Sequence, residues 1–280
     1  MSTSNQQAAN AGVRVAVLGA GKMGGILLEA FLRSGLFTAA QVTATVAHEA
    51  RATALAARLG IQASTNNLEA ARNADVILVG VKPAQVADLV REISPVLTAG
   101  KLLISFAASV STRAIEEAAL PASLSVIRAM PNTPSAVGAG MTALCRGRHA
   151  TDDQLDLAQR IFATVGRAVV VDEKHMDAVT GLSGSGPAFI YIILEALAEA
   201  GVNVGLPREI ATQLAAQTAF GAARMVLETG SHPALLKDEV TTPAGCTVDG
   251  ILELEEGGLR VTLIKAVKKT TERARQLAGN

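Results

Sequence analysis

A glycine-rich turn near the start of the chain constrains the fold more than any other feature of the sequence. The apolar run Val13–Leu18 leads directly into Gly19–Gly24 (GAGKMG), which has the spacing G-x-G-x-x-G, and a helical pattern follows. In such a strand–turn–helix unit the first glycine permits the tight turn, the second lets the backbone approach a pyrophosphate, and the third lets helix and strand pack closely. The free N–H groups at the helix N-terminus then hold the phosphates. We therefore expect a dinucleotide site here, with a purely structural turn as the alternative.

Short apolar runs alternate with helical segments as far as about Thr164. The strand-like runs are Val13–Leu18, Val42–Ala47, Val76–Val81 and Leu102–Ala107, and helical spacing occurs in Met23–Arg33, Ala50–Leu59 and Ala84–Val90. Repeated strand–helix–strand order predicts a parallel sheet with helices on both faces, and continuous apolar strands fit burial on both sides.

Beyond Val165 a brief strand-like run, Ala168–Val171, is followed almost entirely by helical pattern. Pro187–Ala200 is apolar nearly all round, Pro207–Leu227 begins with a proline, and apolar residues from Val261 to Leu277 recur at helical spacing. A central helix that is apolar on every face needs a partner subunit to cover it. Glu195 and Glu199 argue against a membrane span instead.

These patterns predict an α/β fold with an N-terminal Rossmann-type doubly wound sheet followed by an all-α dimerisation domain. We place a disordered tail at residues 1–12, the dinucleotide-binding domain at residues 13–165 and the helical domain at residues 166–280. A homodimer, or a ring of dimers, is the expected assembly.

Composition excludes several classes of partner. Lys and Arg together equal Asp and Glu at 25 each, and aromatic residues make up 2% of the chain, so neither the charge nor the stacking surface for nucleic acid is present. Two cysteines, Cys145 and Cys246, and four scattered histidines do not suggest a metal site. No apolar segment in residues 1–12 resembles a signal peptide, and no run of apolar residues is long enough to span a membrane. We expect a soluble, cytoplasmic protein.

The end of the second strand-like run indicates the type of cofactor. An NAD site usually has an acidic residue there that bonds the ribose 2′-hydroxyl. Here the run continues through Thr45 to His48 without a carboxylate before Glu49. The Thr45 hydroxyl, with His48 or Arg51 as further candidates, suits a 2′-phosphate. NADP is therefore favoured over NAD.

Five further motifs follow one another in a characteristic order. They are Gly80–Pro83 (GVKP), Ala129–Pro134 (AMPNTP), Gly181–Ala188 (GLSGSGPA), Leu236–Thr247 (LKDEVTTPAGCT) and Leu254–Gly258 (LEEGG). In this order and spacing the chain resembles the pyrroline-5-carboxylate reductases from Val13 to Leu277. The resemblance implies NADPH-dependent reduction of a cyclic imine, 1-pyrroline-5-carboxylate, to L-proline, the final step of proline biosynthesis.

The resemblance also assigns site residues. It implies that Val81, Lys82 and Pro83 line the cofactor cleft after the fourth strand, that Ala107 does so after the fifth, and that Asn67 contacts the adenosine side. With the glycine turn and Thr45, the expected cofactor-binding residues are Gly19, Gly21, Lys22, Met23, Gly24, Thr45, Asn67, Val81, Lys82, Pro83 and Ala107.

For the substrate, the resemblance implies that backbone N–H groups of Gly245, Cys246 and Thr247 hold the carboxylate, and that the Thr247 hydroxyl reaches the ring nitrogen as the catalytic group. The family usually has two glycines where this chain has Ala244-Gly245. If the first position has a positive φ, Ala244 carries strain of about 1 kcal/mol.

An imine requires less of a site than a ketone does. Ketone reduction places charge on oxygen and needs a proton donor, commonly Lys or His, and similar hydroxyacid dehydrogenases use a lysine at the start of the second domain. Here no lysine occurs between Lys174 and Lys237. A protonated imine becomes a neutral amine on hydride transfer, so orientation, a grip on the carboxylate and one hydrogen bond suffice.

Structural roles are the alternatives for most of these residues. Thr247 has the position of an N-cap for a helix Val248–Leu254, Ser185 and Gly186 suit either close helix packing or a nicotinamide pocket, and Asn132 suits either its own turn or a ligand. His175 and His232 suit surface or capping positions, and we expect the Cys246 thiol to be incidental.

Two other functions fit the same motifs. A reductase of a related cyclic imine, with a six-membered ring or a 2-carboxylate, would retain every motif, because side chains around the pocket decide the ring. A non-catalytic NADP-binding regulator on the same fold is possible in principle. However, such a sensor has no need of the loop Gly245–Thr247.

Overall fold

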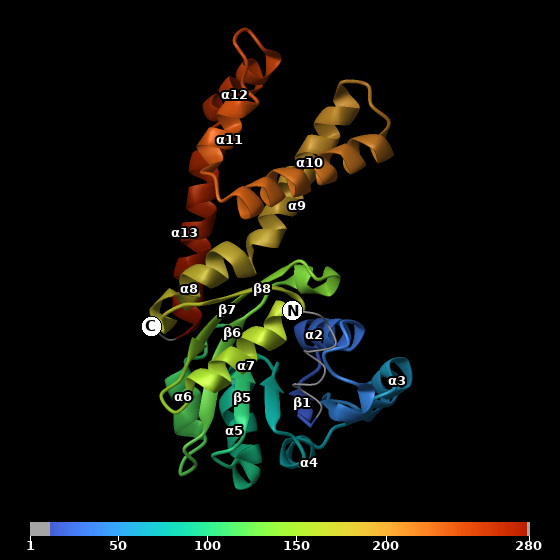
Figure 1. Ribbon diagram of the computed structural model, residues 1–280, viewed down its shortest axis with the longest axis vertical. Coiled ribbons are helices and arrows are strands. Elements are labelled where there is room, and N and C mark those ends of the chain that lie inside the picture. The colour runs from blue at the N-terminus through green and yellow to red at the C-terminus, as the bar shows by residue number, and fades with distance from the viewer. Residues whose placement is uncertain (1–11, 279–280) are drawn as a thin grey trace. The chain divides into compact units, whose positions relative to one another are not determined.

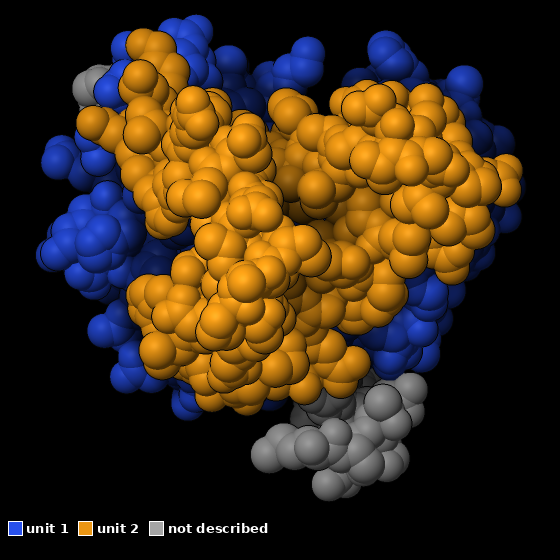
Figure 2. All heavy atoms as spheres, turned by 90° about the horizontal axis from the view of Figure 1, so that it is seen from above, with its two compact units in different colours: residues 1–184, 270–280 blue, residues 185–269 orange. Residues whose placement is uncertain are grey.

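The computed structural model of the protein describes residues 12–278, so the predicted tail at residues 1–12 lies outside the described residues except for Gly12. Within that range the chain forms two compact units (Figure 2). The sheet unit runs up to Gly184 and resumes at Thr270, and the helical unit is Ser185–Lys269. The predicted boundary after residue 165 therefore differs from the division seen in the structure.

The sheet unit is built on eight strands in the order β3-β2-β1-β4-β5-β6-β7-β8 (Figure 1). Their bounds are β1 Val15–Leu18, β2 Val42–Thr45, β3 Gln62–Ser64, β4 Val76–Val79, β5 Leu102–Ser105, β6 Ser125–Met130, β7 Gly140–Arg146 and β8 Gly166–Val170. Every neighbouring pair is parallel except β6 and β7, which are antiparallel. The predicted strand at Ala168–Val171 is thus an edge of the sheet.

Alternation along the strands creates two cores. In β1, Val15 and Val17 pack with helices on one face, whereas Ala16 and Leu18 pack with helices on the other. The first face is covered by α2 (Lys22–Arg33), α3 (Glu49–Leu59) and α7 (Asp152–Ala163), and the second by α4 (Asn67–Arg72), α5 (Val86–Ile93) and α6 (Thr112–Ala118). The predicted doubly wound architecture is confirmed.

The strand order places a crevice at the carboxyl ends of β1 and β4. From β1 the chain proceeds to β2 and β3 on one side, and then crosses to β4 on the other side of β1. The turns that leave these strands therefore diverge, which is where ligands bind in open α/β sheets. The predicted apolar runs of β2, β4 and β5 continue two residues beyond the end of the strand, and those residues begin the turn that follows each strand.

Short helical segments complete the sheet unit. The 3-10 helices are η1 Ala39–Gln41, η2 Pro83–Gln85, η3 Ser94–Val96, η4 Thr133–Val137 and η5 Glu173–His175. After η5 come α8 (Met176–Val179) and the π-helix η6 (Thr180–Gly184), which leads to the helical unit.

The helical unit is centred on two packed helices, α9 (Gly186–Asn203) and α10 (Arg208–Thr229). They approach closely at Gly201, where a Cβ would lie 2.8 Å from the Cβ of Ala211. The unit continues with α11 (Pro233–Glu239), α12 (Cys246–Glu256) and most of α13 (Leu259–Leu277), whose last turns belong to the sheet unit.

The helical unit has a very small core of its own. Its buried hydrophobic residues are Ala198, Ala211 and Ala215. In contrast, large apolar side chains such as Tyr191 and Ile192 are 60% and 65% exposed. By length and composition alone, the helical stretch 173–203 is apolar enough to cross a membrane. An apolar surface this large on one subunit requires a cover.

Candidate active site

The glycine turn Gly19–Gly24 joins β1 to α2 at the carboxyl edge of the sheet. Gly19 has a φ of +84°, and a Cβ there would lie 2.6 Å from Cγ1 of Val81, so a larger residue does not fit. A Cβ on Gly24 would lie 2.8 Å from the carbonyl oxygen of Gly19. Gly21 is the N-cap of α2, and no side chain caps this helix. Its first N–H groups are therefore available to an anion.

A cavity of about 350 Å³ opens beside this turn. Six of the predicted cofactor residues line it, namely Gly19, Gly21, Thr45, Asn67, Val81 and Lys82. Sequence reasoning missed Thr65, which follows β3, and Gln85, which ends η2. Thr65 could have been found from its position directly after β3. However, the sequence Gln62–Ser64 is too polar to be recognised as a strand.

The other predicted cofactor residues lie elsewhere. Lys22 lines a neighbouring cavity of about 450 Å³ that shares Gly21 and Arg51 with the first. Met23, Gly24, Pro83 and Ala107 line neither cavity. Gly24 acts through helix packing, and Ala107 is buried in the turn that follows β5. Contact of these four residues with a cofactor stays a prediction.

The hydroxyl of Thr45 connects the glycine turn to Asn67. It accepts a hydrogen bond from the N–H of Gly19 at 3.2 Å and lies 2.7 Å from Oδ1 of Asn67, to which it donates. The Asn67 amide nitrogen in turn donates to Glu92 at 3.1 Å. The proton of Thr45 is thus used within the protein, and its side chain is 1% exposed. Thr45 is better placed to hold the turn than to donate to a 2′-phosphate.

Arg51 is the cation next to this end of β2. It lines both cavities, and no carboxylate pairs with it among residues 12–278. Glu49, the first carboxylate after β2, accepts a hydrogen bond from Thr65. The mouth of the cavity therefore presents an exposed guanidinium, which suits a phosphate.

In the helical unit, the loop before α12 has the strained geometry that its sequence suggested. Ala244 has a φ of +57°, in the left-handed region that favours glycine. The next residue, Gly245, is extended, and a Cβ on it would lie 2.5 Å from Oγ1 of Thr242. The condition under which Ala244 was expected to carry strain, a positive φ, is therefore met.

The same loop opens α12 with free backbone donors. The N–H of Gly245 donates to the carbonyl of Thr242 at 3.0 Å, and the N–H of Val248 donates to the carbonyl of Gly245 at 3.2 Å. Cys246 and Thr247 are the first two residues of the helix, so their N–H groups have no partner within it. Two of the three predicted donors are therefore available, whereas that of Gly245 is engaged.

Thr247 does not cap this helix. The helix begins at Cys246, its N-cap is Gly245, and no side chain bonds the free N–H groups. The alternative in which Thr247 caps a helix Val248–Leu254 is wrong, because the helix starts two residues earlier. The half-buried hydroxyl of Thr247 makes no hydrogen bond in the described part of the chain, and is therefore free for a ligand.

Structural roles fit three other candidates. Asn132 accepts from the N–H of Met141 at 2.8 Å and donates to the carbonyl of Ser183 at 3.2 Å, so it braces its own turn against the π-helix. His232 caps α11 by accepting from the N–H of Ala234, and His175 is exposed, as expected. Nothing in residues 12–278 brings together three or more His, Cys, Asp or Glu side chains that could hold a metal.

Arg128 is a buried cation in β6. Its side chain is 5% exposed, and its nearest carboxylates are Glu173 at 3.5 Å and Asp177 at 3.9 Å. Glu173 also accepts from the N–H and the hydroxyl of Thr112. Burial, together with the nearby charge of Glu173, raises the pKa of the Cys145 thiol to about 12. Cys145 is thus an inert thiol in this core.

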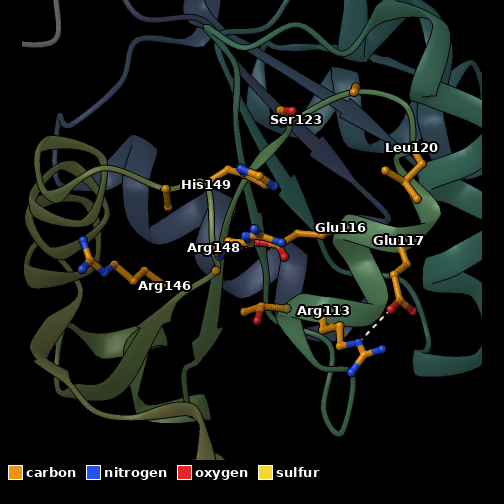
Figure 3. A pocket seen from close by; sticks show the side chains of 12 residues that line it. Arg113, Glu116, Glu117, Leu120, Ser123, Arg146, Arg148 and His149 are labelled. Atoms are coloured by element: carbon orange, nitrogen blue, oxygen red, sulfur yellow. Dashed lines mark hydrogen bonds and ion pairs between the residues drawn. The ribbon is translucent and has the colours of Figure 1, made fainter.

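A third cavity in the sheet unit, of about 820 Å³, lies beside α6 and the end of β7 (Figure 3). Two of the arginines that line it are paired with carboxylates: Arg113 with Glu117 at 2.7 Å, and Arg146 with Asp152 at 2.5 Å. Ser123, which lines it, precedes β6, so the cavity lies toward the amino ends of the parallel strands. It has no glycine turn and is not the dinucleotide site.

Comparison with known proteins places both halves of the chain in described families. A sequence model described as "Pyrroline-5-carboxylate reductase dimerisation" matches residues 173–277, and one described as "NADP oxidoreductase coenzyme F420-dependent" matches residues 14–109. A pyrroline-5-carboxylate reductase of Methanosarcina acetivorans is 42% identical over 264 residues, covering 94% of this chain and 97% of the relative. One from Glycine max is 41% identical over 261 residues, covering 93% and 94%.

Solved structures agree. A pyrroline-5-carboxylate reductase from Coxiella burnetii superimposes with a TM-score of 0.86 at 36% identity, covering 95% of this chain and 98% of that one. The Plasmodium falciparum enzyme, solved with NADP bound, also has a TM-score of 0.86, at 28% identity and the same coverage. The likeness therefore extends over the sheet unit and the helical unit.

Proposed function

The chain belongs to the pyrroline-5-carboxylate reductase family, and we propose that it transfers a hydride from NADPH to the cyclic imine 1-pyrroline-5-carboxylate to give L-proline. A nicotinamide-dependent oxidoreductase of this family acts on a C=N bond. The observation that carries the proposal is that one chain has both of two features. The first is a glycine turn that accepts only glycine at residue 19. The second is a helix start where the N–H groups of Cys246 and Thr247 and the hydroxyl of Thr247 are free.

The glycine turn fits the diphosphate of a dinucleotide. A side chain at residue 19 would strike Val81, so the turn keeps its backbone open, and the uncapped start of α2 supplies N–H donors and a favourable dipole. When bound, NADPH supplies the hydride. The protein's own part here is to bind and orient the cofactor.

The loop before α12 fits the substrate. A carboxylate suits the uncapped start of this helix, where the N–H groups of Cys246 and Thr247 are available. The Thr247 hydroxyl, one residue into the helix, then bonds the ring nitrogen. Hydride addition to the protonated C=N carbon moves the double-bond electron pair to nitrogen and leaves a neutral amine, so no side-chain acid is required.

Thr247 provides the sharpest test of this assignment. Loss of one well-placed contact in a dry site costs about 2–4 kcal/mol, or about 30- to 1,000-fold in rate. We expect Thr247→Ala to lower kcat/KM for the imine by that order, Thr247→Ser to recover most of it, and NADPH affinity to remain unchanged. A matched control is Thr212→Ala in α10, whose exposed hydroxyl bonds only the carbonyl of Arg208.

Steady-state oxidation of NADPH with fresh substrate measures the effect. An alanine variant as active as the control would show that Thr247 is not the catalytic group. The same assay with a six-membered cyclic imine and with a 2-carboxylate imine shows which substrate the enzyme prefers, because all of these imines would bind the same loop. A faster turnover of another imine would displace pyrroline-5-carboxylate from the proposal.

For the cofactor, we propose NADP rather than NAD, with Arg51 as the residue that recognises the 2′-phosphate. Arg51 lines the cavity and pairs with no carboxylate in the described residues 12–278, whereas the nearby Arg58 is paired with Glu29 at 2.6 Å. A charge-assisted hydrogen bond contributes about 1.5–3 kcal/mol, so Arg51→Ala should reduce the NADPH preference by about tenfold or more. Arg58→Ala is the control. A wild-type ratio of kcat/KM that favours NADH would refute the proposal.

The dimerisation domain indicates an oligomer, and we propose a homodimer or a ring of dimers in the cytoplasm. The three-alanine core of the helical unit leaves its large apolar side chains for a second copy to cover, and the pairing of Glu199 with Arg208 disfavours lipid around α9. The free cysteines Cys145 and Cys246 suit a reducing compartment. Sedimentation should give at least twice the 28.7 kDa mass of one chain. An active monomer, or recovery in the membrane fraction, would contradict this.

A further inference from the structure

The hydroxyl of Thr65 is bonded to a carboxylate at the edge of the dinucleotide cavity. Thr65 follows β3 and lines the cavity of about 350 Å³ beside the glycine turn, together with Gly19 and Arg51. Its hydroxyl donates to Oε1 of Glu49, the first residue of α3. One residue in the wall of the cavity is therefore tied to a carboxylate that is not itself part of that wall.

Glu49 is outside the cavity although its neighbours in the chain line it. Ala47, two residues before it, and Arg51, two residues after it, both line the cavity. Glu49 lines neither this cavity nor the adjoining one of about 450 Å³. Its side chain is exposed, and within residues 12–278 the Thr65 hydroxyl is the one donor to its carboxylate. The position of this carboxylate therefore depends on a single hydrogen bond.

A carboxylate in this part of the sheet bears directly on the choice of cofactor. Beyond the end of β2, an acidic side chain that reaches the ribose bonds its 2′-hydroxyl and favours NAD, whereas an arginine accommodates the 2′-phosphate of NADP. This chain has both groups, Glu49 and Arg51, two residues apart. A carboxylate next to the phosphate would repel it, so only one of the two side chains can serve the ribose. The bond that holds Glu49 decides between them.

We propose that Thr65 is a specificity-determining residue for the cofactor, because its hydroxyl holds Glu49 out of the cavity and leaves Arg51 as the charged group at the ribose. This inference rests on the proposed function, in which Arg51 recognises the 2′-phosphate of NADP. Without the Thr65 hydroxyl, the Glu49 side chain is free to turn toward the cavity. There its carboxylate repels the 2′-phosphate of NADPH and accepts a hydrogen bond from the ribose 2′-hydroxyl of NADH.

Three variants test this role. Thr65→Val removes the hydroxyl at nearly constant size, and we expect it to lower the preference for NADPH over NADH about fivefold, the effect of one carboxylate near a doubly charged phosphate in water. Adding Glu49→Gln to Thr65→Val removes the charge and should restore the wild-type preference. The matched control is Thr53→Val in α3, whose exposed hydroxyl bonds the backbone carbonyl of Glu49 at 3.1 Å rather than its carboxylate. This control should keep the wild-type preference.

Fluorescence titration gives the Kd of NADPH and of NADH for each protein, and the ratio of the two is the readout. If the Thr65 bond only joins α3 to the loop after β3, Thr65→Val weakens both cofactors alike and leaves the ratio unchanged, which would overturn the inference. A lowered ratio that Glu49→Gln does not restore would also overturn it, because the Thr65 hydroxyl itself would then contact the phosphate.

The titration needs no imine, so this test is separate from that of the reaction. A wild-type protein that binds NADPH but does not oxidise it in the presence of the imine would refute the proposed function and leave the Kd ratios readable. A wild-type ratio that favours NADH would refute the proposed cofactor preference. Even then, a fall of the ratio in Thr65→Val and its return in the double variant would support the role of Thr65.

Discussion

Replacing Ala244 by glycine tests the strained loop before α12 directly. Ala244 has a φ of +57° and its side chain is exposed, so the substitution relieves the backbone without removing packing within the subunit. A non-glycine residue in the left-handed region costs about 1–2 kcal/mol. Glycine, in turn, costs about 0.4–1 kcal/mol through the extra freedom of the unfolded chain. The net expectation is a gain of about 0.5 kcal/mol in the free energy of unfolding.

Ala139 is a matched control for this substitution. It is also exposed and lies in a loop, but its φ is not positive. Ala139→Gly therefore meets only the unfolded-state effect and should lose about 0.4–1 kcal/mol. The two glycine variants are expected to change stability in opposite directions, by about 1–2 kcal/mol between them.

Urea unfolding at a fixed protein concentration measures the difference, because the stability of an oligomer depends on concentration. Since Ala244→Gly keeps the loop geometry, its kcat/KM for the imine should equal that of the wild type. Ala244→Val should lose both stability and activity, because a β-branched residue is poorly tolerated at positive φ. If Ala244→Gly destabilises the protein as much as Ala139→Gly does, the loop is not left-handed in solution and the argument fails.

Three further outcomes follow from other contacts. Gly24→Ala should abolish NADPH binding in a fluorescence titration, because its Cβ would lie 2.8 Å from a carbonyl oxygen of the glycine turn; normal binding would show that the turn adapts. Glu173→Gln should lower the free energy of unfolding by about 2–3 kcal/mol, since the buried Arg128 loses a charged partner, and an unchanged urea midpoint would contradict this. A thiol reagent should label one cysteine per native chain: Cys246 is exposed, whereas Cys145 is buried and burial raises its pKa to about 12, so it should react only after unfolding. Two labelled thiols in the native protein would be the opposing result.

Local pattern was sufficient for the regular elements with uniform burial. The four strand-like runs became β1, β2, β4 and β5, because strands buried on both faces read as continuous apolar sequence. Likewise α9 and α10 appear close to their predicted bounds. In contrast, the sequence pattern did not reveal β6, because Arg128 interrupts its apolar run. A cation is tolerated there because the tertiary structure brings Glu173, 45 residues later in the chain, and Asp177 beside it.

The candidate site shows the same division. The glycine turn could be read from the sequence because the steric demand at each glycine is local, and the strain at Ala244 could be expected for the same reason. The start of α12 at Cys246 could not be read from the sequence, because sequence patterns do not fix helix ends to within one or two residues. That difference decides whether Thr247 caps the helix or lies inside it.

The sequence by itself therefore determined the fold class, the place of the dinucleotide turn and the family, since these depend on residue periodicity and on motifs with local geometry. Only the tertiary structure decided that the Thr45 hydroxyl donates to Asn67 and that the Ser109 hydroxyl donates to α13. It also decided that no carboxylate within the described part of the chain pairs with Arg51. The physical reason is that a hydrogen bond or an ion pair between segments far apart in sequence depends on where folding brings both partners. The local sequence around one partner does not indicate which residue the other partner is.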